Sequence, residues 1–110
     1  RFIMEYAISK EVYEYNPETK QFELIPGGTE NVVANGLTMK EAVDFIESNA
    51  KPEYLTTVDI PCNDNHERFL GFDLQSKLDR NGNGRAVAEG HRVVHWRIIP
   101  SLTMDMDKDQ

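Results

Sequence analysis

Residues 91–100 have the sequence HRVVHWRIIP, the clearest strand signal in the chain. Successive side chains of a strand point to opposite faces, and β-branched and aromatic residues favour that conformation. We therefore predict a strand over residues 91–99, which Pro100 ends because proline cannot donate a ladder hydrogen bond. One face carries Arg92, Val94, Trp96 and Ile98, and the opposite face carries His91, Val93, His95, Arg97 and Ile99.

A second strand signal starts at the N-terminus. Apolar residues alternate with others from Phe2 to Ile8, and strand-forming residues continue to Tyr15. Residues 16–20 (NPETK) then supply turn chemistry, because asparagine bonds its own backbone and proline presets φ. A return strand over residues 22–25 completes a predicted β-hairpin, which the following Pro-Gly-Gly sequence ends.

The best helix signal begins at Thr38. Its hydroxyl can accept a hydrogen bond from the N–H of Glu41, and the Glu41 carboxylate can reach back to the N–H of Thr38. This reciprocal arrangement is a capping box. Because Pro52 limits the far end, a helix is predicted over residues 39–50.

Residues 62–78 fit two structures. Their leucines match helical spacing, with Asn63 or Asp64 available as an N-cap, whereas the apolar residues within 68–75 alternate as in a strand. Gly71 costs a helix about 1 kcal/mol relative to alanine. On that ground a strand over residues 68–75 is favoured.

These elements predict a single α+β domain over residues 1–100. It would contain an antiparallel sheet of four to five strands, including a short strand at residues 55–60, with one main helix packed on one face. Residues 101–110 are polar and acidic, which predicts a flexible tail. Long edge strands in such a sheet favour a homodimer over a monomer.

Charge is divided unevenly along the chain. The net charge is −7, yet residues 77–100 carry +3 and contain four of the six arginines. Guanidinium groups gathered in an acidic chain indicate a surface for an anion or a partner. The same cations can instead pair across the sheet with carboxylates such as those of Glu5, Glu11 or Glu14. The candidate ligand- or partner-binding residues are Arg85, His91, Arg92, His95, Trp96 and Arg97.

No pattern in the sequence predicts a catalytic residue, a metal site or a cofactor. Residues 79–84 (DRNGNG) resemble the start of a calcium loop, but Gly90 stands where that loop needs a bidentate glutamate. His91 and His95 could clamp a metal on a helix, but four strand residues span about 13 Å. The sequence contains neither a glycine-rich loop ending in GKS or GKT nor a G-x-G-x-x-G motif, the two common phosphate-binding patterns.

Three classes of function fit these observations. The leading hypothesis is a small acidic non-catalytic interaction protein, an adaptor or inhibitor that masks a partner protein, in particular a basic or nucleic-acid-binding one. An alternative is a binder of a small anionic ligand such as a nucleotide, through the Arg/His-rich strand 85–97. A third is a small hydrolase with His66, His91 or His95 as its base. The negative net charge disfavours direct binding to nucleic acid or to an anionic membrane.

The sequence also bears on location. No apolar run approaches the roughly 18 residues of a membrane-spanning helix. Residues 1–5 (RFIME) contain charges where a signal peptide would be apolar. Cys62 is the only cysteine, which excludes an intrachain disulfide and favours a reducing compartment. We therefore expect a soluble, cytoplasmic protein.

Overall fold

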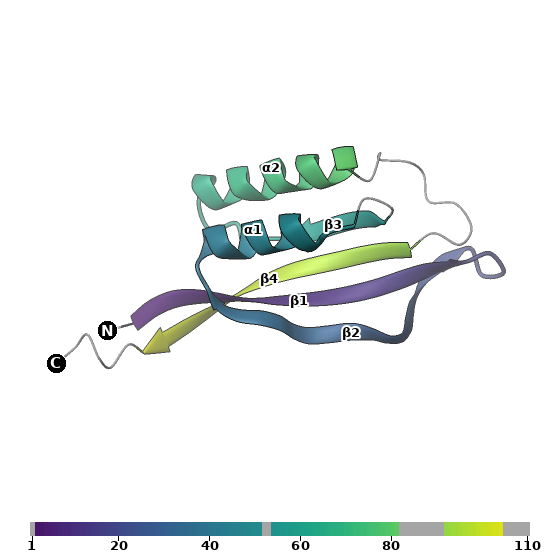
Figure 1. Ribbon diagram of the computed structural model, residues 1–110, viewed down its shortest axis with the longest axis horizontal. Helices are drawn as coiled ribbons and strands as arrows, with labels where there is room; N and C mark the ends of the chain where they lie inside the picture. Colours follow the sequence, from purple (N-terminus) through teal and green to yellow (C-terminus); the bar gives the residue numbers. More distant parts are fainter. Residues whose placement is uncertain (1, 52–53, 82–91, 105–110) are drawn as a thin grey trace.

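The structure is a computed structural model, and it describes residues 2–51, 54–81 and 92–104 (Figure 1). In chain order its elements are β1 (Phe2–Asn16), β2 (Gln21–Leu37), α1 (Met39–Asn49), β3 (Leu55–Asp59), α2 (Asn65–Asn81) and β4 (Arg92–Met104). The four strands form one sheet in the order β2-β1-β4-β3. β1 is antiparallel to both β2 and β4, whereas β3 and β4 are parallel. The α+β fold class is therefore confirmed, whereas the predicted antiparallel sheet is wrong in one respect, because the β3–β4 pair makes the sheet mixed.

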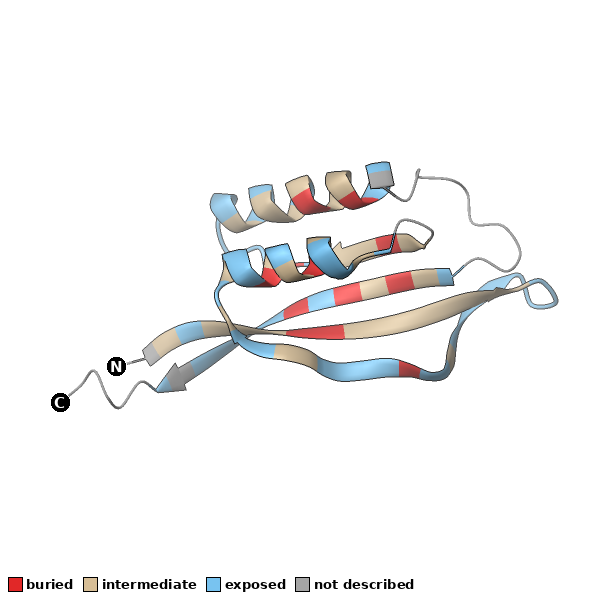
Figure 2. Ribbon diagram, in the orientation of Figure 1, coloured by how far each residue is buried: buried red, intermediate tan, exposed pale blue. Residues whose placement is uncertain are grey.

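Both helices lie over the same face of the sheet (Figure 1), and each carries buried residues (Figure 2). The core lies between these two layers. It consists of Ile8, Ala42, Ile46, Ile60, Leu74, Leu78, Val94, Trp96 and Ile98. Among the described residues, no helix covers the opposite face, which we call the open face. The sheet thus offers two different surfaces, one partly enclosed by helices and one exposed.

Three local predictions are confirmed. The capping box of α1 forms, with Thr38 Oγ1 accepting from the Glu41 N–H at 3.1 Å and Glu41 Oε1 accepting from the Thr38 N–H at 2.9 Å. In the turn between β1 and β2, Asn16 Oδ1 accepts from the Glu18 N–H at 2.9 Å. The short strand predicted at residues 55–60 is β3. All three depend on residues close together in the sequence.

The strand predicted over residues 68–75 is wrong, because this segment lies within α2. Asp64 caps the helix, since its Oδ1 accepts from the Glu67 N–H at 2.7 Å. Leu74 and Leu78 are buried, which offsets the cost of Gly71. A helix also suits the topology, because parallel strands such as β3 and β4 need a long crossover, usually helical. The structure therefore has two helices over the sheet instead of one.

β2 and β4 are longer than predicted. β2 continues past Pro26 to Leu37, and shifts in its register with β1 accommodate the irregular segment. β4 continues through Pro100, which pairs with Tyr6, to Met104. Because the pairing of β3 with β4 ends at Arg97, β4 has no second neighbour at Pro100 among the described strands, and a proline is tolerated there. β4 thus extends into the segment for which a tail was predicted.

Candidate functional site

The candidate binding residues of the sequence do not form one site. Arg92 and Trp96 lie on the helix-covered face of β4, in line with the buried Val94 and Ile98, whereas His95 and Arg97 lie on the open face. The alternation predicted for this strand is therefore confirmed. Arg85 and His91 lie outside the described residues, as do residues 82–84 of the calcium-loop-like segment.

On the open face, Arg97 lies between two carboxylates. Its guanidinium is 3.8 Å from the Glu11 carboxylate on β1 and 3.7 Å from the Asp59 carboxylate on β3. His95 Nδ1 lies 2.7 Å from the hydroxyl of Thr57 on β3. The expected pairing of this face with Glu11 is confirmed. Exposed pairs of this kind stabilise a sheet by at most about 1 kcal/mol each.

The histidines named as possible bases do not share a site. His66 is exposed in the first turn of α2, on the helix side, and His95 lies on the open face. The sheet therefore separates them. Among the residues that the structure describes, no group of three or more His, Cys, Asp or Glu side chains gathers to hold a metal.

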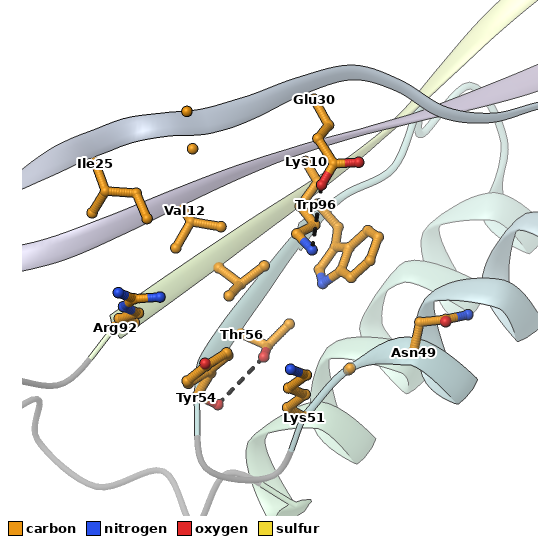
Figure 3. Close-up of a pocket in the computed structure, with 14 residues that line it drawn as sticks. Lys10, Val12, Ile25, Glu30, Asn49, Lys51, Tyr54, Thr56, Arg92 and Trp96 are labelled. Carbon is orange, nitrogen blue, oxygen red and sulfur yellow. Dashed lines mark hydrogen bonds and ion pairs between the residues drawn. The ribbon is translucent and has the colours of Figure 1, made fainter.

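A pocket of about 200 Å³ lies on the helix-covered side of the sheet, beside the C-terminal end of α1 (Figure 3). Its walls come from β1, β2, β3 and β4, from the last residue of α1 and from the segment that follows it. Three cationic side chains line it, Lys10, Lys51 and Arg92, with Glu30 as the one carboxylate among the described lining residues. The larger apolar and aromatic residues of the wall are Val12, Ile25, Tyr54, Val94 and Trp96.

The strands approach closely where they form this pocket. Gly28 of β2 is buried, and a Cβ at this position would come within 2.8 Å of the Val12 carbonyl oxygen on β1. A glycine is therefore needed for the observed spacing between the two strands. Gly27 beside it adopts φ +70°, a conformation that favours glycine. The irregular Pro-Gly-Gly segment of β2 thus shapes one wall of the pocket.

Trp96 carries the most unusual polar group of the site. Its side chain is only 3% exposed, and the indole Nε1–H has no hydrogen-bond acceptor among the described residues. Leaving a buried donor without an acceptor costs about 1–3 kcal/mol. The ring itself is well packed, with its centre 6.4 Å from the Phe45 ring in an edge-to-face arrangement. A tightly held ring with an unmet donor calls for an acceptor from outside the described chain.

The cations of the pocket differ in how well they are compensated. Lys10 Nζ is 3.8 Å from the Glu30 carboxylate, and the Arg92 guanidinium is 3.7 Å from that of Glu14. Lys51 forms no ion pair within the described part of the chain, and its ammonium lies 5.7 Å from the centre of the Tyr54 ring. In Figure 3 the Lys51 ammonium and the indole nitrogen of Trp96 point towards each other across the pocket. Together they present one uncompensated positive charge and one free N–H.

Sequence analysis identified Arg92 and Trp96 but missed the two lysines. Lys10 had a detectable signal, because it interrupts the apolar face formed by Tyr6, Ile8 and Val12. Lys51 had none, since it follows the predicted helix as an ordinary polar residue. The position of Lys51 across the pocket from Trp96 depends on how α1 packs against the sheet.

Comparisons with known proteins add no homologue, since no protein-family model, curated protein or solved structure matches this chain. No helix in the described ranges is both long enough and apolar enough to cross a membrane. The features that bear on function are therefore the geometry of the pocket and that of the open face.

Proposed function

We propose that this protein binds a small anionic ligand in the pocket beside Trp96. The observation that supports this most directly is the buried indole N–H of Trp96, which faces the pocket and has no acceptor among the described residues. An anionic oxygen would accept this hydrogen bond and offset the charge of Lys51. Hydrogen bonds to an ionised partner are about twice as strong as neutral ones.

This site differs from the anion site expected on strand 85–97. Arg92 and Trp96 belong to both, but His95 and Arg97 lie on the other side of the sheet from the pocket. The local positive charge explains how a chain of net charge −7 attracts an anion. The pocket, not the whole strand, is the proposed site.

Thermal shift and calorimetry with benzoate, phenyl phosphate, inorganic phosphate and adenosine monophosphate test the proposal. A ligand at a hundred times its dissociation constant adds about 2.7 kcal/mol to stability, which raises Tm by several degrees. We expect at least one anion to do so, and Lys51→Met to remove most of the shift. Absence of a shift with every anion would overturn the proposal.

Two matched variants serve as controls. Arg97→Ala removes a cation from the strand of Trp96 but on the opposite face. Lys40→Met removes an exposed lysine at the other end of α1 from Lys51, where it pairs with Asp44 at 3.1 Å. Both should keep the full ligand-induced shift. If Arg97→Ala abolishes the shift while Lys51→Met retains it, the ligand binds on the open face and the proposed pocket is wrong.

A second candidate function is the binding of a basic protein partner on the open face, as an adaptor or inhibitor would require. Its support is a shallow apolar hollow of described residues, Tyr13, Phe22, Leu55, Thr57, Val93 and His95. The Phe22 side chain is 42% exposed, and the carboxylates of Glu11 and Asp59 lie at the same face. Arg97 pairs with both carboxylates, so these three groups carry a net charge of −1 beside the hollow. An apolar hollow next to a net negative charge suits a partner segment that is both apolar and basic.

A synthetic peptide of alternating lysine and leucine probes this second candidate. In an NMR titration we expect amide shifts concentrated at Leu55, Val93 and Tyr13, reduced by salt and by Val93→Asp. Shifts spread evenly over the acidic surface, or unchanged by Val93→Asp, would show only non-specific charge attraction.

A further inference from the structure

The chemistry of the pocket narrows the class of ligand further, an inference that rests on the proposed function. The pocket volume of about 200 Å³ is the first constraint. Pockets for cofactors and drug-sized molecules are larger, about 300–1,000 Å³. The part of a ligand that this pocket encloses is therefore smaller than a nucleotide.

Charge is the second constraint. Lys10 and Arg92 each face a carboxylate of the protein, so among the described residues Lys51 alone contributes an uncompensated positive charge. The pocket also adjoins Asn49 and Ala50 at the C-terminal end of α1, where the helix dipole places a partial negative charge. One negative charge on the ligand would be balanced, and a second would be repelled. This balance favours a monoanion over a phosphate dianion.

The donors and the apolar wall are the third constraint. The indole N–H is a single donor, and the Lys51 ammonium points to the same region of the pocket (Figure 3). Two oxygens of one carboxylate can accept from these two groups. A phosphate group usually binds to several backbone N–H groups at a helix N-terminus, and this pocket adjoins the opposite end of a helix. Val12, Val94 and Tyr54 offer an apolar surface to the remainder of the ligand.

We infer that the ligand is a small monocarboxylate with a compact apolar body. Its carboxylate accepts hydrogen bonds from Trp96 Nε1–H and Lys51 Nζ, and its apolar part packs on Val12, Val94 and Tyr54. No covalent step is involved. Lys10, held over the Trp96 ring, positions the indole without itself carrying the ligand's charge.

Isothermal titration calorimetry with three matched probes tests this assignment. Benzoate, benzamide and phenyl phosphate share one ring and differ in the group that would meet Trp96 and Lys51. We expect benzoate to bind at least tenfold more tightly than either of the others, a difference of about 1.4 kcal/mol. Trp96 is the only tryptophan in the chain, so its fluorescence reports independently whether a probe reaches the pocket.

Two variants separate the roles of the donors. Trp96→Phe keeps a ring but removes the N–H and should weaken benzoate binding about tenfold. Because this residue is buried, Lys51→Met provides a second test at an exposed position, and Lys51→Arg should retain most of the affinity. Lys40→Met is the control and should bind benzoate like the original chain.

The outcomes distinguish this inference from the proposed function. If phenyl phosphate binds more tightly than benzoate and Lys51→Met abolishes both, the pocket binds anions but the carboxylate assignment is wrong. Equal binding of benzoate and benzamide would also overturn the assignment, because the charge would then not be recognised. If neither benzoate nor phenyl phosphate binds or alters the fluorescence of Trp96, both the carboxylate assignment and the proposed function are overturned.

Discussion

Lys10 Nζ lies 5.2 Å from the centre of the Trp96 ring, on the face of the sheet that both helices cover. The lysine comes from β1 and the tryptophan from β4, the two central strands. A cation over an indole face is attracted by the ring quadrupole. The contact fixes the ring whose N–H faces the pocket, and it places a lysine among the apolar residues of β1.

This contact predicts a measurable contribution of Lys10 to stability. Lys10→Met keeps the length of the side chain but removes the charge, so the free energy of unfolding should fall by about 0.5–1 kcal/mol. Urea denaturation, monitored by the fluorescence of Trp96, measures this change in the free energy of unfolding. Lys40→Met, which removes a lysine far more exposed, should change stability by less than about 0.5 kcal/mol. Equal effects of the two variants would contradict a specific role for the contact with Trp96.

The burial pattern of α2 predicts a sharp contrast between two large side chains of one helix. Leu74 is fully buried, whereas Phe72 is 75% exposed. Leu74→Ala should therefore lower the free energy of unfolding by about 2–5 kcal/mol. Phe72→Ala should change it by less than about 0.5 kcal/mol, as is usual for surface positions. If residues 68–75 formed a strand, both side chains would lie on the same face. Replacing either with alanine would then lower the free energy of unfolding by a similar amount.

The sequence predicted the elements whose signals are local. The capping box of Thr38 and Glu41 needs only residues three apart, and the alternation of residues 91–99 is complete within one strand. The helix α2 was missed because the penalty at Gly71 is local, whereas the gain from burying Leu74 and Leu78 depends on the sheet. The contacts across the sheet, such as that of Arg97 with Glu11, could be foreseen from charge and alternation.

The pocket could not be predicted in the same way. Lys10, Lys51 and Trp96 are far apart in the sequence, and their approach follows from the strand order and from the direction in which α1 ends. No local pattern marks Lys51. The unmet N–H of Trp96 is visible only once the surroundings of the indole are known, because a tryptophan on an apolar strand face is otherwise an ordinary core residue.

Two tyrosines have raised pKa values, and we therefore predict that the protein loses stability in alkaline solution. Burial, followed by the nearby carboxylate of Glu67, raises the pKa of Tyr6. A hydrogen bond donated to Glu11 at 2.9 Å raises the pKa of Tyr13. Both pKa values in the folded chain therefore lie above the ordinary value of about 10. The folded state then holds more protons than the unfolded state, so stability is complete below about pH 10 and is lost as the pH rises through the folded values.

The variant Tyr6→Phe/Tyr13→Phe tests this dependence. Its free energy of unfolding should fall less between about pH 9 and pH 11 than that of the original chain. Lys77, whose pKa is raised by a hydrogen bond to Asp73, acts in the same direction and remains in both proteins. Phenolate absorbance during the titration identifies the tyrosine contribution. An identical alkaline loss in the double variant would show that the two phenols are not responsible.

We predict that replacing glycine with alanine has opposite effects on the free energy of unfolding at two positions, Gly71 and Gly28. At Gly71, inside α2, an added Cβ would meet Ile60 at 3.5 Å, an ordinary contact, and alanine is the better helix former. Gly71→Ala should therefore raise the free energy of unfolding by about 0.5–1 kcal/mol. At Gly28, a Cβ would lie 2.7 Å from Ile25 Cγ1 and 2.8 Å from the Val12 carbonyl oxygen. Gly28→Ala should lower stability by about 1–3 kcal/mol.

The second substitution also bears on the pocket. Because Gly28 and Val12 both line it, relief of the clash would move β2 away from β1 and enlarge the space beside Trp96. Gly28→Ala should therefore weaken benzoate binding as well as stability, whereas Gly71→Ala should leave binding unchanged. Urea denaturation and calorimetry on the two variants measure both effects. Unchanged benzoate binding in a folded Gly28→Ala chain would mean that the spacing of β1 and β2 does not define the site.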